Sequence, residues 1–243
     1  MAVNKDSNSY TFIFAILMVI IVGSGLAAVS VGLKPMQDKN TVTKKKMDIL
    51  NALQVTDLDD IDEVNRKNAN DLYNKFVIEE ECIVLNSFGI PIEGEVAFDI
   101  DIKTEFKNKN LVINDRKYPL YIAEIGGEKK YIIPMVGSGL WGPIWGYIAV
   151  NGDKSSIFGA SFDHKTETPG LGAEIKQGFF TDRFKSEVIS ENGTYKKLKF
   201  VKDGSGTDLH KIDGITGGTI TSKGVEEMLD RTIQVYVDYF NNN

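Results

Sequence analysis

The sequence predicts an α+β fold: an N-terminal transmembrane helix, then helices, then a mostly antiparallel sheet with a C-terminal helix. Residues 10–33 form an uncharged apolar run. Segments after residue 96 are rich in β-branched and aromatic residues, and residues 222–240 carry apolar side chains at helical spacing. We expect a tail over residues 1–9, a membrane helix over 10–33, a helical linker over 34–95 and an α+β domain over 96–243.

The apolar run from Tyr10 to Leu33 contains no charge and no proline. As a helix it would extend roughly 36 Å, enough to cross a hydrocarbon core of about 30 Å. A cleaved signal peptide is the alternative, but its apolar region usually has about 7–15 residues behind a basic segment. The length therefore favours a retained anchor. Lysines after the run outnumber Lys5 before it, and this count alone would place the C-terminal domain in the cytoplasm.

Pro35 is expected to end the membrane helix. Apolar residues three and four positions apart then predict amphipathic helices over residues 44–55 and 60–78. Acidic residues between 57 and 63 superficially resemble a calcium loop, but Asn68 stands where a bidentate glutamate is needed. A solvated linker is the better interpretation.

Composition patterns predict strands in the second half of the chain. We expect them over residues 96–103, 117–125, 129–136 and 146–152. A turn at residues 191–194 is expected to join residues 187–189 and 197–201 as a hairpin.

The composition limits the possible functions. The chain has 243 residues and a formal net charge of -6, which argues against nucleic acid as a partner. A single cysteine, Cys82, excludes an internal disulfide and a cysteine-ligated metal or iron–sulfur centre. His164 and His210 leave little room for a histidine-rich metal site, so we expect no metal. Any redox chemistry would then depend on an organic cofactor.

The segment from Gly137 to Gly142 has the G-x-G-x-x-G spacing of dinucleotide-binding loops. However, Pro143 and a predicted strand follow it, where a phosphate-binding helix would have to begin. Two interpretations remain open. The segment is either a turn with Trp141 and Trp145 in the core, or a loop against an aromatic ligand, because glycine lets backbone approach a ring closely.

A second loop runs from Glu167 to Gly172, where Pro169 and Gly170 favour a tight turn with exposed N–H groups. From the local sequence, an exposed loop acid is the default interpretation of Glu167. A functional carboxylate is the alternative.

A third loop, from Asp213 to Ser222, combines glycines and hydroxyl residues directly before the C-terminal helix. Hydroxyls and backbone N–H groups at a helix N-terminus suit a phosphate. The order is not that of a Walker loop. By local physics alone, Thr221 or Ser222 is by default an ordinary helix cap.

Together these motifs resemble the FMN-binding domain family, and within it the C subunits of sodium-translocating NADH:quinone reductases. The similarity spans nearly the whole chain. It is carried, in family order, by Leu33-Lys34-Pro35-Met36-Gln37 after the anchor and by the segments Gly139–Gly142, Glu167–Gly172 and Thr216–Ser222. In the family, FMN is esterified to the last threonine of the final motif, which corresponds to Thr221. Gly218 replaces the usual alanine.

The resemblance implies an electron-carrying subunit of an NADH:quinone oxidoreductase, with no independent catalysis. Its covalent FMN would be attached by a separate Mg²⁺-dependent flavin transferase. The other implied partners are the remaining subunits of the complex and the membrane. The implied cofactor-binding residues are Leu140, Trp141, Glu167, Thr168, Leu171, Gly172, Asp213, Thr216, Gly217, Gly218, Thr219, Thr221 and Ser222.

The resemblance also bears on topology and on the alternatives. In the family, the flavin domain lies on the outer side of the cytoplasmic membrane, so we expect a periplasmic domain despite the lysine count. One alternative is the flavoprotein (G) subunit of an Rnf-type ferredoxin-oxidising complex. The LKPMQ segment and the insert between Lys44 and Ile90 favour the sodium-translocating group over it. Another alternative is a non-flavin, membrane-tethered binding domain whose glycine loops are only turns.

Overall fold

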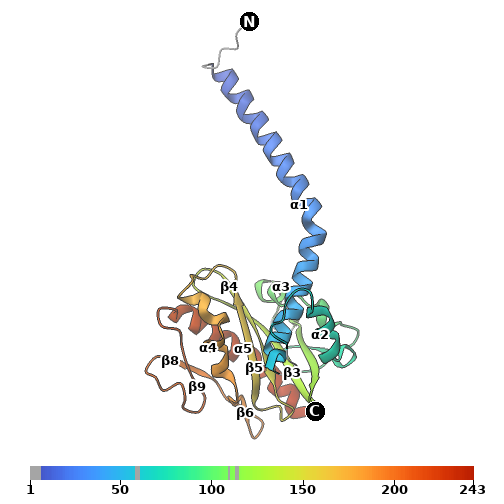
Figure 1. Cartoon of the computed structure of the whole chain (residues 1–243), viewed down its shortest axis with the longest axis vertical. Coiled ribbons are helices and arrows are strands. Elements are labelled where there is room, and N and C mark those ends of the chain that lie inside the picture. The colour runs from blue at the N-terminus through green and yellow to red at the C-terminus, as the bar shows by residue number, and fades with distance from the viewer. Residues whose placement is uncertain (1–6, 58–60, 109, 113–114) are drawn as a thin grey trace. The chain divides into compact units, whose positions relative to one another are not determined.

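A computed structural model describes residues 7–57, 61–108, 110–112 and 115–243. The chain divides into two compact units, Met1–Lys45 and Lys46–Asn243. Helix α1 (Asn8–Ala52) supplies the described part of the first unit, and its last turns belong to the second (Figure 1).

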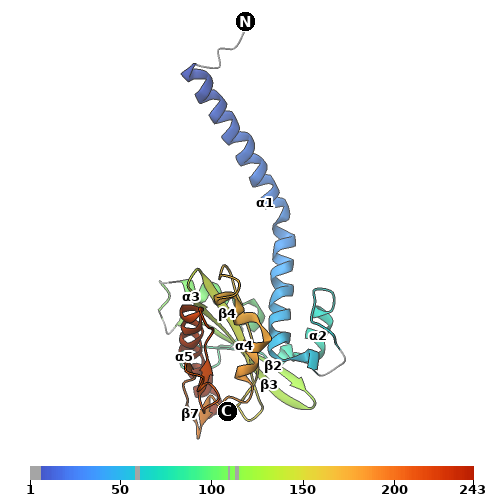
Figure 2. The ribbon, with the colours of Figure 1, turned by 60° about the vertical axis from the view of Figure 1, so that its left-hand side comes forward.

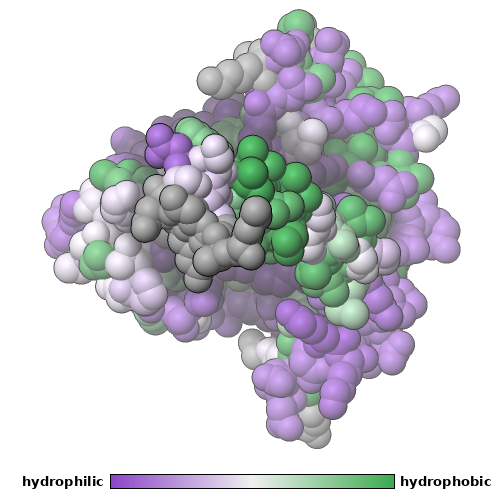
Figure 3. Space-filling model, turned by 90° about the horizontal axis from the view of Figure 1, so that it is seen from above, coloured by the Kyte–Doolittle hydropathy of each residue, from purple (hydrophilic) through white to green (hydrophobic). Residues whose placement is uncertain are grey.

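Helix α1 continues through Pro35, so the break predicted there is wrong. A proline inside a helix removes one hydrogen bond and crowds the preceding turn. Here Lys34 pairs with Asp38 across the proline at 2.6 Å, an i,i+4 pair that supports the helix. The most apolar 18 residues of α1 have a mean hydropathy of 2.8, and none is buried within the described structure. In Figure 3, hydrophobic residues form a contiguous green group. By length and composition, α1 can cross a membrane.

The helix predicted over residues 60–78 is shorter in the structure. Helix α2 spans Ala69–Phe76, and residues 58–60 lie outside the described residues, as does part of the acidic stretch compared with a calcium loop. Asn65 and Asn68 explain the late start. Their side chains accept hydrogen bonds from each other's backbone N–H groups, at 3.3 and 2.8 Å, which competes with helix formation. Short 3₁₀ turns, η1 (Val55–Asp57) and η2 (Glu79–Glu81), flank this region.

Five antiparallel strands form the central sheet, in chain order: β1 (Ile83–Leu85), β2 (Tyr118–Ile125), β3 (Glu128–Ser138), β4 (Pro143–Val150) and β5 (Ile157–His164). The predicted strands over residues 117–125, 129–136 and 146–152 are confirmed. Gly126 and Gly127, both with positive φ, make the tight turn between β2 and β3.

The strand predicted over residues 96–103 is wrong. The segment forms the 3₁₀ turn η3 (Ala97–Asp99) and the start of helix α3 (Ile102–Lys107). Asp101 causes the change, because its side chain accepts hydrogen bonds from Lys103 N at 3.0 Å and from Thr104 Oγ1 at 2.7 Å. This is the capping pattern that starts a helix, and it overrides the alternating apolar residues.

An apolar layer covers each face of the sheet. Helix α5 (Thr219–Asn242) lies on one face, where Val225 and Ile233 pack with Leu120 of β2. On the other face, Leu50 from the end of α1 and Tyr73 of α2 pack with residues that include Tyr121, the next residue along β2. Figure 2 shows α5 and α2 on opposite sides of the strands. The result is the predicted α+β fold, confirmed with its mostly antiparallel sheet.

The segment between β5 and α5 is built from short elements. They are η5 (Gly172–Lys176), α4 (Gly178–Thr181), η6 (Asp182–Phe184), β6 (Ser190–Glu191), β7 (Thr194–Tyr195), β8 (Lys199–Val201) and β9 (Lys211–Asp213). The predicted turn at Asn192-Gly193 is confirmed between β6 and β7, with positive φ at both residues. Neither predicted arm is right: Val188 forms a bridge with Ser156 instead, and β8 pairs in parallel with β9. Strand β9 leads directly into the third glycine-rich loop.

Candidate functional site

Three loops that are far apart in the sequence line one cavity of about 260 Å³. They are the turn between β3 and β4, the loop after β5, and the loop between β9 and α5. The lining residues are Leu140, Trp141, Glu167, Thr168, Leu171, Gly172, Gly217, Gly218, Thr219, Ile220 and Thr221. Most residues singled out from the sequence therefore meet here. Ile220 was missed, because nothing in its type or spacing distinguishes it from a core residue.

Thr221 and Ser222 do not cap the C-terminal helix. Helix α5 begins at Thr219 with Gly218 as its cap residue, and no side chain makes a capping bond there. Both hydroxyl residues lie buried in the first turn. Ser222 Oγ accepts a hydrogen bond from Ile215 N at 2.9 Å, which closes the glycine-rich loop onto the helix. The default interpretation from the sequence is thus wrong for both residues.

Thr221 donates its hydroxyl hydrogen bond to Glu167 Oε2, at 2.5 Å. Thr221 is 2% exposed and Glu167 is 4% exposed. Glu167 Oε1 accepts a second hydrogen bond, from Trp141 N, at 2.7 Å. The default interpretation of Glu167 as an exposed loop acid is therefore wrong. One buried carboxyl group joins the three loops, and each of its oxygens has a donor.

The loop after β5 holds Glu167 through its backbone. Glu167 N donates to His164 Nδ1 at 3.1 Å. Thr168 O accepts bonds from Leu171 N and Ala173 N, both at 3.1 Å, around the expected turn at Pro169 and Gly170. Gly170 has φ 75°, a conformation that glycine adopts without strain.

Two glycines make room for the carboxyl group. A Cβ added at Gly172 would come closer than 3.0 Å to both Thr221 Oγ1 and Glu167 Oε2, and one at Gly139 would come equally close to Glu167 Oε1. The two loops therefore need glycine at these positions if Glu167 is to reach Thr221.

The rim of the cavity is apolar and exposed. Trp141 is 66% exposed, and Leu140, Leu171 and Ile220 are exposed as well. The interpretation that buries Trp141 in the core is therefore wrong. An open cavity with an apolar rim and a few fixed polar groups is typical of a site for an aromatic ligand.

Asp213 and Thr216 lie outside this cavity. They line a neighbouring cavity of about 420 Å³ together with Arg183 and Lys202, and Gly217 borders both. Arg183 Nη1 donates to the carbonyl oxygens of Asp213 and Gly214, which fixes the start of the loop. The predicted set is thus divided between the two sides of the glycine-rich loop.

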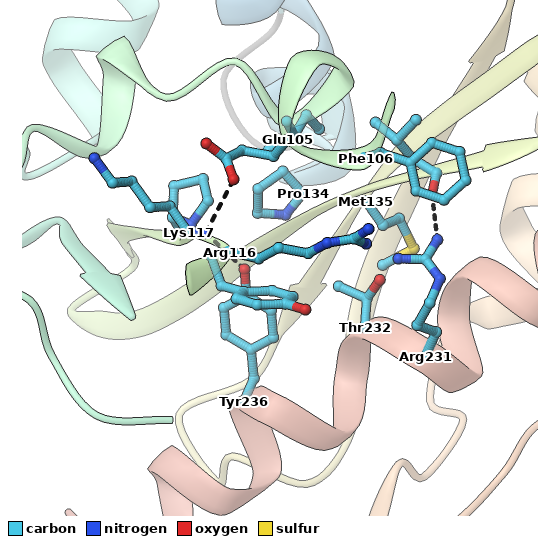
Figure 4. Close-up of a pocket in the computed structure, with 13 residues that line it drawn as sticks. Glu105, Phe106, Arg116, Lys117, Pro134, Met135, Arg231, Thr232 and Tyr236 are labelled. Atoms are coloured by element: carbon cyan, nitrogen blue, oxygen red, sulfur yellow. Dashed lines mark hydrogen bonds between the residues drawn. The ribbon is translucent and has the colours of Figure 1, made fainter. Parts of the chain in front are cut away.

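A further cavity, between α3, β2, β3 and α5, contains none of the predicted residues (Figure 4). It has a volume of about 40 Å³ and is lined by residues that include Arg116, Arg231 and Tyr236. Arg231 Nη2 donates to Val136 O at 2.6 Å, and Tyr236 Oη donates to Pro119 O at 2.8 Å. These two bonds tie α5 to the sheet, a structural role.

The chain is similar to known proteins over nearly its whole length. The family model of the FMN-binding domain matches residues 139–234, which include the cavity described above. The C subunit of the Na⁺-translocating NADH-quinone reductase from Neisseria meningitidis serogroup B is 30% identical, covering 92% of this chain and 88% of that protein. The corresponding protein of Haemophilus ducreyi is 29% identical over the same shares.

Two solved structures resemble this one. The crystal structure of the C subunit of the Na⁺-translocating NADH-quinone reductase from Parabacteroides distasonis has a TM-score of 0.75 and 37% identity, covering 87% of this chain and 98% of that one. The structure of Shewanella oneidensis NqrC, with a TM-score of 0.63 and 20% identity, supports the fold alone.

Proposed function

Because the chain belongs to the family of C subunits of Na⁺-translocating NADH-quinone reductases, we propose that it carries FMN bound covalently through its phosphate to Thr221. It is a flavoprotein subunit of an oxidoreductase complex, and its FMN-binding domain includes Thr221. We propose that the FMN serves as an electron carrier and that α1 anchors the subunit in the membrane. The observation that carries the attachment site is the position of Thr221, with its hydroxyl held by Glu167 within the cavity.

The residues present fit a flavin nucleotide. Thr221 lies in the first turn of α5, where backbone N–H groups have no partner within the helix and the helix dipole favours a phosphate. The exposed Leu140, Trp141 and Leu171 provide apolar surface for an isoalloxazine ring. Gly172, Gly217 and Gly218 allow the backbone to approach the ligand closely.

When bound, FMN supplies one-electron transfer, and the protein binds and orients it. We propose that Leu140, Trp141, Thr168 and Leu171 contact the ring, and that Thr219 lies beside the phosphate. Asp213, Thr216 and Ser222 would act from outside the cavity by shaping the loop, as the bond from Ile215 N to Ser222 Oγ illustrates. A separate flavin transferase would perform the attachment.

The similarity to known proteins also bears on the complex. The relatives described above carry the name of the Na⁺-translocating enzyme and match over 88% of their length. This supports the other subunits of that enzyme as partners, in preference to an Rnf-type complex. A tethered binding domain without flavin is disfavoured by the FMN-binding family match.

Thr221→Ala is expected to abolish the covalent adduct. The full chain would be produced in cells that also contain a flavin transferase, and its intact mass would be measured. The wild-type chain should gain the mass of FMN minus water, and the band should fluoresce after denaturing electrophoresis. Thr194→Ala, at an exposed position of β7, is the control and should be fully modified. An adduct that persists in Thr221→Ala would refute the assigned site.

We further propose that α1 leaves the C-terminal domain on the periplasmic side. The native thiol is a poor probe of this orientation. Burial raises the pKa of Cys82 to about 11, and a neutral thiol reacts slowly with maleimides. Two single-cysteine variants made on Cys82→Ser would serve better: Asn243→Cys at the C-terminus and Ser9→Cys before the apolar run.

In intact spheroplasts, a membrane-impermeant maleimide is expected to label Asn243→Cys fully. Ser9→Cys should be labelled only once the membrane has been permeabilised, because one membrane crossing separates the two positions. The reverse pattern would place the domain in the cytoplasm, as the lysine count predicts.

A further inference from the structure

We propose that Glu167 is the base that accepts the proton of Thr221 when the flavin phosphate is attached. The inference rests on the proposed attachment to Thr221 and deepens it, because it places a catalytic group on the acceptor chain. Glu167 Oε2 lies 2.5 Å from Thr221 Oγ1, the atom that must react.

The chemistry requires such a base. A threonine hydroxyl is a weak nucleophile until its proton is removed. The phosphoryl donor must be an activated flavin nucleotide, of the flavin dinucleotide class. A bond forms between Thr221 Oγ1 and the phosphorus next to the flavin, while the phosphoanhydride bond breaks and the nucleoside monophosphate leaves. The proton of Thr221 passes to Glu167 Oε2, and no redox change occurs.

The direction of the Thr221 hydroxyl is unusual for a helix. Threonine in a helix commonly donates to the carbonyl oxygen one turn earlier. Thr41 and Thr43 of α1 do so here, each at 3.0 Å. Thr221 instead bonds to Glu167, a residue 54 positions away in the sequence. Its proton is thus directed at the group that can remove it.

Glu167 is itself held in position. Trp141 N donates to Oε1 at 2.7 Å, which fixes the carboxyl plane and leaves Oε2 toward Thr221. The donors on the two carboxyl oxygens of Glu167 are neutral, the Thr221 hydroxyl and Trp141 N. Its proton-accepting oxygen is therefore not committed to a cation. General bases with this geometry contribute about 10²–10⁴-fold to a rate.

The same proton would stabilise the product. Once Thr221 is an ester it has no proton to donate, and an ionised Glu167 beside the phosphate would be repelled. A proton retained on Oε2 turns the carboxyl group into a hydrogen-bond donor toward the ester or phosphate oxygens.

The test uses the full chain in detergent, produced without a transferase, then mixed with purified flavin transferase, FAD and Mg²⁺. The rate of adduct formation is followed by intact mass at saturating acceptor. Glu167→Gln is expected to slow the maximal rate by about 10²–10⁴-fold with an unchanged KM for the acceptor chain. Glu174→Gln is the matched control, because its carboxylate accepts from Gly170 N on the same loop at 2.8 Å without contacting Thr221.

A second readout is the split between the maximal rate and the KM for the acceptor chain, because a merely structural role of Glu167 would also weaken binding. A wild-type rate in folded Glu167→Gln, or a loss that lies entirely in KM, would overturn the proposal. If Glu167→Gln fails to fold, Glu167→Ala replaces it, and a wild-type rate in that variant has the same meaning. Adduct formation in Thr221→Ala would instead refute the attachment site, so the two failures are distinguishable.

Discussion

Gly172→Ala is expected to slow FMN attachment by about 10- to 100-fold while the chain still folds. A Cβ at this position would lie closer than 3.0 Å to both Thr221 Oγ1 and Glu167 Oε2. Overpacking of this kind costs about 1–3 kcal/mol, and the strain would be relieved by separating the two side chains. If this strain raises the activation free energy of attachment by the same amount, the rate falls roughly tenfold for each 1.36 kcal/mol.

The control for this substitution is Gly178→Ala. Gly178 has no positive φ, and an added Cβ would meet only Asp182 Oδ2, at 3.7 Å. Both variants would be compared in the rate of adduct formation and in Tm. Slow modification of Gly172→Ala with a Tm within a few degrees of the wild-type value would support the close packing of Thr221 and Glu167. Modification at the wild-type rate would show that this packing is not needed for attachment.

Strands β2, β3 and β4 of the central sheet were predictable because their signals are local, whereas β1 and β5 were missed. The segments that became β2, β3 and β4 are rich in β-branched and aromatic residues and are separated by turn residues. The strand expected over residues 96–103 has similar apolar spacing, yet Asp101 caps a helix there. The capping side chain starts a helix there, and the spacing of apolar residues does not reveal such a cap.

Most residues of the candidate site could be predicted from the sequence, but their positions relative to one another could not. Glycine-rich loops and hydroxyl residues pointed to the loops that meet at the cavity. The burial of Glu167 was not predictable, because its donors come from residues 26 and 54 positions away. Sequence spacing also gave no reason to separate Asp213 and Thr216 from Thr221. That separation arises because the loop turns at Gly217, where φ is 75° and the backbone changes direction.

Deletion of residues 1–33 is expected to move the protein from the membrane to the soluble fraction. The removed segment contains the most apolar stretch of α1, which has no buried residue within the described structure. Residues 46–243 form a compact unit of their own, and the deletion leaves intact the α1 residues that pack in it, such as Ile49 and Leu50. The shortened protein should therefore keep the Tm of the C-terminal domain.

A substitution tests the same anchor without shortening the chain. Ile20→Lys together with Val22→Lys places two charges within the apolar stretch. Insertion of a charged side chain at the centre of a membrane helix costs about 2.5–3.5 kcal/mol. Ile20→Leu with Val22→Leu is the apolar control. After a carbonate wash of membranes, the leucine variant should remain in the pellet and the lysine variant should be released or fail to insert.

If the wild-type chain is itself released, or its N-terminal mass shows that the apolar segment has been removed, the segment is a signal peptide. In that case the flavin domain would have to be held at the membrane by the other subunits, because no other described helix has the length and hydropathy to cross it.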